Sequence, residues 1–164
     1  MSEIDDVLNS GLIDLYYSSA VSGIKEEWLK NLDEKWYQYI SNLSDKEKVT
    51  YHVALLDEEV AHGGFNQYFA SGFGQFAKDT INSLKLINAN KSALILEKAY
   101  EYVNKRNLDD AVFRKKLLLN EIEELYNDED LDDALIELDN EYSDYEDNIA
   151  VLLNTYLSSN TSDT

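Results

Sequence analysis

Residues 131–142 read LDDALIELDNEY, and the spacing of the apolar residues in this stretch decides the fold class. The leucines and the tyrosine recur every three or four residues, which is the period of one face of an α-helix. The pattern continues to residue 156, and at about 100° per residue its apolar positions fall within an arc of about 100°. These positions are Leu131, Leu135, Leu138, Tyr142, Tyr145, Ile149, Leu152 and Tyr156.

Carboxylates occupy the opposite side of the same pattern. Five of them fall on the arc facing away from the apolar side chains, and two more flank that arc. We therefore expect folded amphipathic helices from about residue 121, with the apolar stripe on a core and the acids in water. We predict that the following acids bind a protein partner: Glu129, Asp130, Asp133, Glu137, Glu141, Asp144 and Asp147.

The charge of the chain is concentrated in its last quarter. The 164 residues carry a net charge of −19, with 18 acids and 14 bases in residues 1–120 and 15 acids and no base in residues 121–164. Such a field repels nucleic acid and anionic membranes, which are themselves polyanions, and attracts basic surfaces. The predicted partner is therefore a basic protein, with no direct contact to nucleic acid or membrane.

The density of acids also invites a comparison with DNA. Residues 121–147 contain 14 acids. As one straight helix they would span roughly 40 Å, or about one charge per 3 Å, against roughly 3.4 Å per phosphate on one DNA strand. The sequence thus suggests an acidic surface that imitates a nucleic-acid backbone.

The rest of the chain also indicates helices. It contains no proline, the main helix breaker, and no stretch has the alternation typical of a strand. Ser44 followed by Glu47 forms a capping box that predicts a helix start. We expect an all-α bundle of seven to nine helices, with a single domain over residues 1–158 and a frayed tail over 159–164. The predicted helices cover residues 4–19, 24–40, 45–61, 66–71, 75–87, 91–104, 108–126, 131–142 and 145–158.

The first residues and the composition of the chain indicate its cellular compartment. The first ten residues carry Glu3, Asp5 and Asp6, where a secretory signal would carry basic residues. There is no cysteine, so a disulfide framework is excluded. No apolar run approaches the roughly 18 residues of a membrane span. We expect a cytoplasmic protein.

Residues 59–69 read EVAHGGFNQYF and contain a double glycine. Paired glycines usually serve backbone geometry, so we predict that they end the preceding helix in a turn. The aromatic residues that follow are expected to enter the core. The predicted structural motif comprises Gly63, Gly64, Phe65, Gln67, Tyr68 and Phe69.

This stretch resembles the signature E-x-x-N-G-G-F-x-Q-[YF]-[FY] of a bacterial DNA-mimic protein domain family. The later segments LDNEY at 138–142 and NTYL at 154–157 resemble the same family, so the likeness runs from about residue 36 to 157. It implies an all-α fold and, as in the best-known member, a dimer whose acidic surface occupies the DNA-binding face of a transcription factor. His62 stands where the family usually has Asn.

The sequence also contains residues that could indicate other functions. His52, Glu59 and His62 could suggest a metal or acid–base site, but two histidines ten residues apart do not form a zinc-binding helix face. Asp128, Asp130 and Asp132 begin like a calcium loop that lacks its glycine and its final glutamate. We expect no catalytic residues, no metal and no cofactor. An inhibitor of a toxin, and an acidic domain whose charge only aids solubility, remain alternatives.

Overall fold

The computed structural model describes residues 3–30, 34–144 and 147–159, without the side chains of residues 3–10 and 30. In these ranges the chain forms ten α-helices, one 3₁₀-helix and no strand, which confirms the all-α class with one helix more than predicted. Residues 160–164 of the predicted tail lie outside them. The helices are α1 (Glu3–Val21), α2 (Glu26–Lys30), α3 (Lys35–Ser41), α4 (Asp45–Ala70), η1 (Phe73–Phe76), α5 (Ala77–Leu86), α6 (Asn90–Val103), α7 (Asp110–Leu118), α8 (Glu124–Asn127), α9 (Glu129–Asp144) and α10 (Ile149–Leu157).

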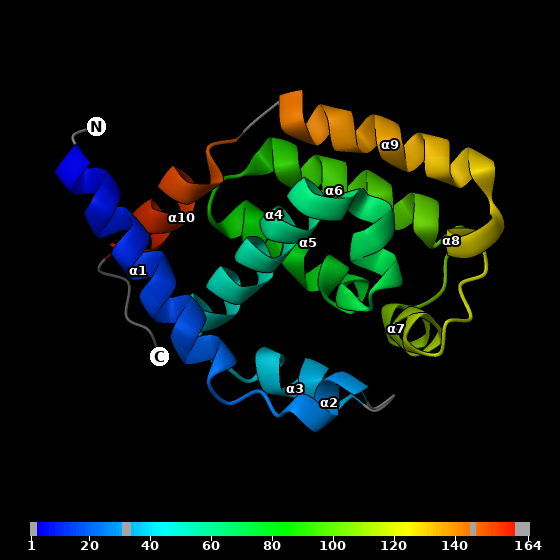
Figure 1. Cartoon of the computed structure of the whole chain (residues 1–164), viewed down its shortest axis with the longest axis horizontal. Helices are drawn as coiled ribbons and strands as arrows, with labels where there is room; N and C mark the ends of the chain where they lie inside the picture. The colour runs from blue at the N-terminus through cyan, green and yellow to red at the C-terminus, as the bar shows by residue number, and fades with distance from the viewer. Residues whose placement is uncertain (1–2, 31–33, 145–146, 160–164) are drawn as a thin grey trace.

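Helix α4 is the centre of the fold, and α1, α5, α9 and α10 pack around it. Helix α9 lies along one edge of the molecule, whereas α2 and α3 lie at the opposite edge (Figure 1). The apolar stripe of α4 is almost completely buried, with Val49 and Val53 each 1% exposed and Leu56 0% exposed. None of the described helices has the length and hydropathy needed to cross a bilayer.

The predicted start of α4 is confirmed. The backbone N–H of Glu47 donates to the Ser44 hydroxyl oxygen at 3.3 Å, which satisfies one of the free donors of the first turn. The Ser44 hydroxyl in turn donates to Glu47 Oε1 at 2.8 Å. The same carboxylate accepts a hydrogen bond from Ser19 of α1 at 2.7 Å, so this cap also joins two helices.

The prediction of one helix over residues 24–40 is wrong, because the structure has α2 and α3 on either side of residues 31–34. The rings of Trp28 and Tyr39 lie 5.5 Å apart. On one straight helix these residues would be separated by about 16 Å along the axis, at about 1.5 Å per residue. The contact therefore requires α2 to fold back on α3. Residues 31–33 are outside the described ranges.

The prediction of one helix over residues 108–126 is also wrong. Helix α7 ends at Leu118, and Asn120 adopts the left-handed conformation with φ 58°, before α8 begins at Glu124. Asparagine tolerates this conformation better than most residues. The break turns Ile122 and Leu125 into the core, where they are 3% and 4% exposed.

The double glycine makes a kink within α4, where two separate helices were predicted. Gly64 has φ 77° and ψ −179°, whereas the helix continues on both sides of it. This backbone conformation is accessible almost only to glycine. The kink swings the second half of α4 so that Phe65, Tyr68 and Phe69 are all 0% exposed.

The acidic last quarter is folded onto the core, but it is not one straight helix over residues 121–147. It consists of α8, α9 and α10, with residues 145–146 outside the described ranges. Leu131, Leu135 and Leu138 are buried, as the apolar pattern of the sequence predicts. Tyr142, Ile149, Leu152 and Tyr156 are partly buried and pack against the same core, whereas Tyr145 is not described.

Candidate protein-binding surface

The carboxylates of α9 divide into an outward and an inward set. The outward set is exposed to solvent, and within the described ranges no hydrogen bond or ion pair engages its side chains. We call these residues, Glu129, Asp130, Asp133, Glu137 and Asp144, the outer row. Glu141, which was predicted with them, is only partly exposed on the same helix.

The inward set holds α9 against the kinked part of α4. The backbone N–H of Phe65 donates to Asp139 Oδ1 at 2.8 Å. About two turns earlier on α9, the Asn66 side-chain amide donates to Asp132 Oδ1 at 2.9 Å, and it also donates to the Leu125 carbonyl oxygen at 3.3 Å. Burial raises the pKa of Asp139 above its usual range, although the hydrogen bond from Phe65 acts in the opposite direction.

The inward acids explain the geometry of the double glycine. The Asp139 carboxylate lies so close to Gly64 that a Cβ atom at this position would collide with it. The kink also frees the Phe65 N–H from its place in the helix, and Asp139 supplies the missing acceptor. Of the other motif residues, Gly63 and Gln67 are exposed, and a Cβ atom at Gly63 would meet the Gln67 side chain.

Both ends of α9 are fixed by acids that lie outside the outer row. At its start, Asp128 Oδ1 accepts from the Leu131 N–H at 3.1 Å, and its Oδ2 pairs with Lys105 at 2.8 Å. Beyond its end, Asp147 Oδ2 accepts from the Ser92 N–H in the first turn of α6 at 2.8 Å. Helix α6 therefore runs antiparallel to α9. Its first turn bonds to Asp147 beyond the end of α9, and Lys105, just after α6, bonds to Asp128 at the start of α9. Asp147, predicted as a partner-binding residue, lies at this junction.

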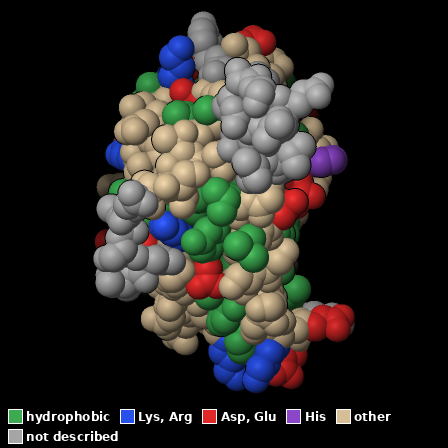
Figure 2. Space-filling view, turned by 90° about the vertical axis from the view of Figure 1, so that its left-hand side faces the viewer, with side chains coloured by type: hydrophobic (Ala, Val, Ile, Leu, Met, Phe, Trp, Pro, Cys, Tyr) green, Lys and Arg blue, Asp and Glu red, His purple; other side chains and the backbone are tan. Residues whose placement is uncertain are grey.

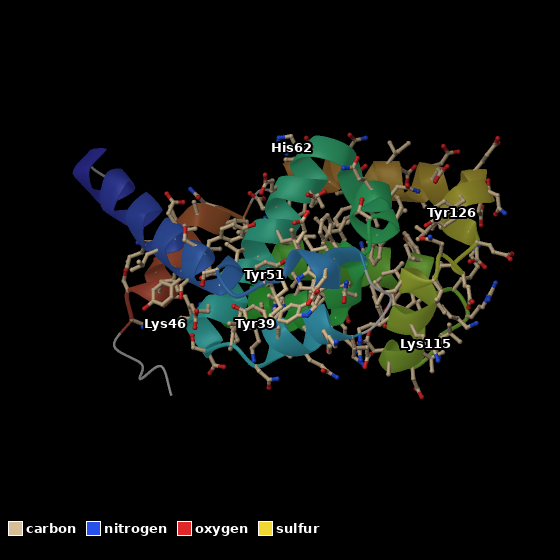
Figure 3. All side chains as sticks on the ribbon, turned by 60° about the horizontal axis from the view of Figure 1, so that its bottom comes forward. Tyr39, Lys46, Tyr51, His62, Lys115 and Tyr126 are labelled. Atoms are coloured by element: carbon tan, nitrogen blue, oxygen red, sulfur yellow. The ribbon has the colours of Figure 1, made fainter. Side chains whose placement is uncertain are left out.

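The basic residues near the acidic quarter pair with the acids that precede α9. Arg106 bonds to Glu124 at 3.1 Å and Lys116 to Glu121 at 3.6 Å, in addition to the Lys105–Asp128 pair. The proximity of Lys105 lowers the pKa of Asp128. The acids that form these ion pairs thus lie around α7 and α8, whereas the outer row of α9 forms none among the described residues. Lys115 projects from α7 at an edge away from α9 (Figure 3).

The end of the molecule at α1 carries charges of both signs (Figure 2). Figure 2 looks onto the end of the molecule at α1 and shows a band of hydrophobic side chains with scattered charges of both signs. The acids along α9 therefore do not continue as an unbroken field over the coloured part of that end.

The two histidines occupy unrelated environments. His52 is 2% exposed, and its Nδ1 lies 2.9 Å from the Ser83 hydroxyl oxygen. Burial lowers the pKa of His52 to about 3, with a smaller effect from Lys48. His62 lies at the surface near the kink (Figure 3), where its Nδ1 bonds to the Glu58 carbonyl oxygen at 2.7 Å. Within the described ranges no three acidic or histidine side chains are grouped to hold a metal ion.

A cavity of about 550 Å³ lies between α4, the start of α6, the end of α9 and the start of α10. Its carboxylates come from Asp57 and Asp147. Each already accepts a hydrogen bond, Asp57 from the Tyr142 hydroxyl at 2.9 Å and Asp147 from the Ser92 N–H. Both acids therefore join elements of the fold at this cavity.

The helices and the outer row define an all-α protein with one strongly acidic helical face. The chain belongs to the DMP19-like protein family, a family of DNA-mimic proteins, whose sequence model matches residues 41–160. The matched residues include all of α4 to α10, and hence the kink, the inward acids and the outer row. Comparisons with curated proteins and with solved structures gave no match.

Sequence reasoning missed the inward acids. Asp132 and Asp139 were not separated from the other carboxylates, because their partners Asn66 and Phe65 are distant in sequence. One signal was available: Asp139 is four residues after Leu135, so it lies only about 40° from the apolar stripe. A carboxylate that close to a buried face needs a hydrogen-bond donor, and the freed N–H at the double glycine provides one.

Proposed function

We propose that the outer row of α9 binds the DNA-binding surface of a basic protein and keeps that surface from DNA. The observation that carries the proposal is the row of exposed carboxylates without partners among the described residues. Membership of a DNA-mimic family supports it, because the matched region includes the whole of α9. A transcription regulator is the class of partner that we infer.

The spacing of the carboxylates suits such a partner. Asp130, Asp133, Glu137, Glu141 and Asp144 recur every three or four residues along one side of α9. At about 1.5 Å per residue the series spans about 21 Å, or about 5 Å per charge, against about 3.4 Å of axis per phosphate on a DNA strand. The charge density is lower than a straight acidic helix over residues 121–147 would have, but still of the same order as that of DNA.

The anchoring of α9 favours recognition by a fixed pattern of charge. Its inner face is held by Asp132 and Asp139, and its surroundings at either end by Asp128 and Asp147. The outer carboxylates therefore belong to a helix that is already ordered, so the partner does not have to order it. Less conformational entropy is lost on binding when the site is preorganised.

A competition experiment tests the proposal. The partner is isolated from the native host on immobilised protein at low salt, identified, purified and bound to its labelled DNA duplex. Addition of this protein is expected to release the DNA, with a potency that falls steeply as salt rises, because exposed charges are screened. A homodimer, which the family resemblance implies, would present two such faces, and light scattering measures that state.

Two variants with equal charge make the experiment specific. The first neutralises the outer row by Asp130→Asn, Asp133→Asn and Glu137→Gln, and we expect at least about tenfold weaker competition, since three charge contacts are removed. The second removes the same charge elsewhere, by Asp14→Asn, Glu27→Gln and Asp109→Asn, and is expected to compete like the wild type. Equal potency of the first variant and the wild type would refute the assignment to α9.

A further inference from the structure

The outer face of α9 carries one large apolar side chain among its carboxylates. Ile136 is 54% exposed, although α9 buries its other large aliphatic side chains, Leu131, Leu135 and Leu138. Asp133 precedes it by one turn, Glu137 is its neighbour in the chain and Asn140 follows by one turn. The isoleucine thus stands within the acidic face.

The position of Ile136 on the helix is fixed by the inward acids. Asp132 and Asp139 lie four residues before and three residues after it, so all three share one side of α9. Those two acids contact Asn66 and the Phe65 N–H. Ile136 therefore projects along the margin of the acidic face that borders the kink of α4.

Neither local helix formation nor packing explains an isoleucine here. A β-branched residue is a weaker helix former than the glutamate or lysine that an exposed position readily accepts. More than half of its surface remains in contact with water. Isolated exposed apolar residues are common on proteins, but this one lies beside a row of carboxylates that attracts basic proteins.

The pairing of anions with an apolar group matches the chemistry of the DNA major groove. A protein that reads the groove meets phosphate oxygens at the backbone and the methyl group of thymine at the base edge. Such a protein contacts that methyl group with apolar atoms placed between its cationic side chains. The outer row and Ile136 offer anions and methyl groups side by side.

We propose that Ile136 is an apolar anchor of the partner-binding surface, which enters a recess lined by apolar side chains and surrounded by lysine or arginine on a basic DNA-binding protein. The inference rests on the proposed function, because the charges bring the partner to α9. It adds that the partner is selected by shape and apolar contact as well as by charge.

Two synthetic helical peptides of equal length and equal lysine and arginine content test this. One carries leucine between its basic residues, and the other has serine at the same positions. Binding of each labelled peptide to the full protein is measured by fluorescence anisotropy at low and at moderate salt. We expect the wild-type protein to prefer the leucine peptide by about five- to tenfold, the range of a modest apolar contact.

Matched variants test whether Ile136 is the residue that causes the preference for the leucine peptide. Ile136→Ser is expected to bring the two peptides to within about twofold of each other, and Ile136→Leu to restore the preference for leucine. Leu29→Ser serves as the control, because Leu29 is 51% exposed on α2 at the opposite edge of the molecule (Figure 1). This variant should keep the wild-type preference.

The outcomes separate this inference from the proposed function. If both peptides bind the wild type equally, in a salt-dependent manner, the proposed function stands and the role of Ile136 is refuted. A leucine preference that survives in Ile136→Ser also refutes it. If neither peptide binds at low salt, the charge-based function and the inference both fail.

Discussion

Asp139 of α9 accepts a hydrogen bond from the backbone N–H of Phe65, 74 residues earlier in the chain, at 2.8 Å. The contact joins the acidic helix to the double-glycine kink of α4. It means that two features that look independent in the sequence, an acidic helix and a glycine pair, are one structural unit.

The effect of replacing Asp139 on stability should depend on whether the new side chain still accepts the hydrogen bond from Phe65. Asp139→Ala leaves the Phe65 N–H without its partner and is expected to lower the free energy of unfolding by about 1–3 kcal/mol. Asp139→Asn keeps an acceptor oxygen and removes the charge of a partly buried carboxylate whose pKa is raised, so its effect should stay below about 1 kcal/mol. Urea unfolding measures both. Asp133→Ala, on the exposed side of α9, is the control, and equal losses for all three variants would contradict this role of Asp139.

Alanine should have opposite effects at two glycines. Gly64 has a backbone conformation that is nearly exclusive to glycine, and a Cβ atom would collide with Asp139, so Gly64→Ala should destabilise the protein by about 2–4 kcal/mol. Gly11 lies in α1 with nothing within 4 Å of an added Cβ atom. There alanine should stabilise by about 0.5–1 kcal/mol, because it favours the helix. Thermal unfolding of the two variants checks the signs, and a stabilised Gly64→Ala would rule out the kink as described.

His52 should make the fold sensitive to acid. The unfolded chain binds a proton on this histidine near pH 6.5, whereas burial lowers the pKa of the folded protein to about 3. The stability associated with neutral His52 is therefore full above about pH 6.5 and is lost as pH falls toward 3. Between pH 7 and pH 5 the wild type should lose about 2 kcal/mol more than His52→Gln. Parallel pH profiles of the two proteins, measured by urea unfolding, would show that His52 is not buried in its neutral form.

The same substitution should have opposite effects at the two ends of α9. Asp130 lies in the first turn, where the helix dipole favours negative charge, and Asp144 is the last residue, where the dipole disfavours it. Asp130→Asn is therefore expected to destabilise, and Asp144→Asn to stabilise, by about 0.3–1 kcal/mol each at low salt. Added salt should shrink both effects. Two shifts of the same sign would indicate that other charges dominate at these positions.

The sequence pattern was sufficient to predict the helices whose buried face or first residue is determined by neighbouring residues in the chain. The period of the apolar residues placed α9 and its buried leucines, and the capping box placed the start of α4. The break at residues 119–123 contains no glycine or proline, and neither does the sequence between α2 and α3, so composition marks neither place. The contact of Trp28 with Tyr39 and the burial of Ile122 depend on tertiary packing, and no local sequence pattern records such contacts.

The sequence predicted which acids could form the candidate surface, but not which of them the fold uses for its own hydrogen bonds. Helical periodicity separates the exposed Asp130, Asp133 and Glu137 from the buried leucines. It does not reveal that Asp147 is used by α6 or that Asp139 is used by α4, since both depend on backbone N–H groups that the fold alone brings near.

Because the inward and outward carboxylates of α9 are separate, its outer surface should tolerate substitution. Asp132 and Asp139 hold the helix in place. Residues such as Glu129 and Glu137 can therefore be substituted without changing how α9 packs on the core. Evolution could in this way retarget the protein while its scaffold stays constant. In the laboratory, a library randomised on the outward side with the inward acids kept should yield mostly folded proteins with altered partner preference.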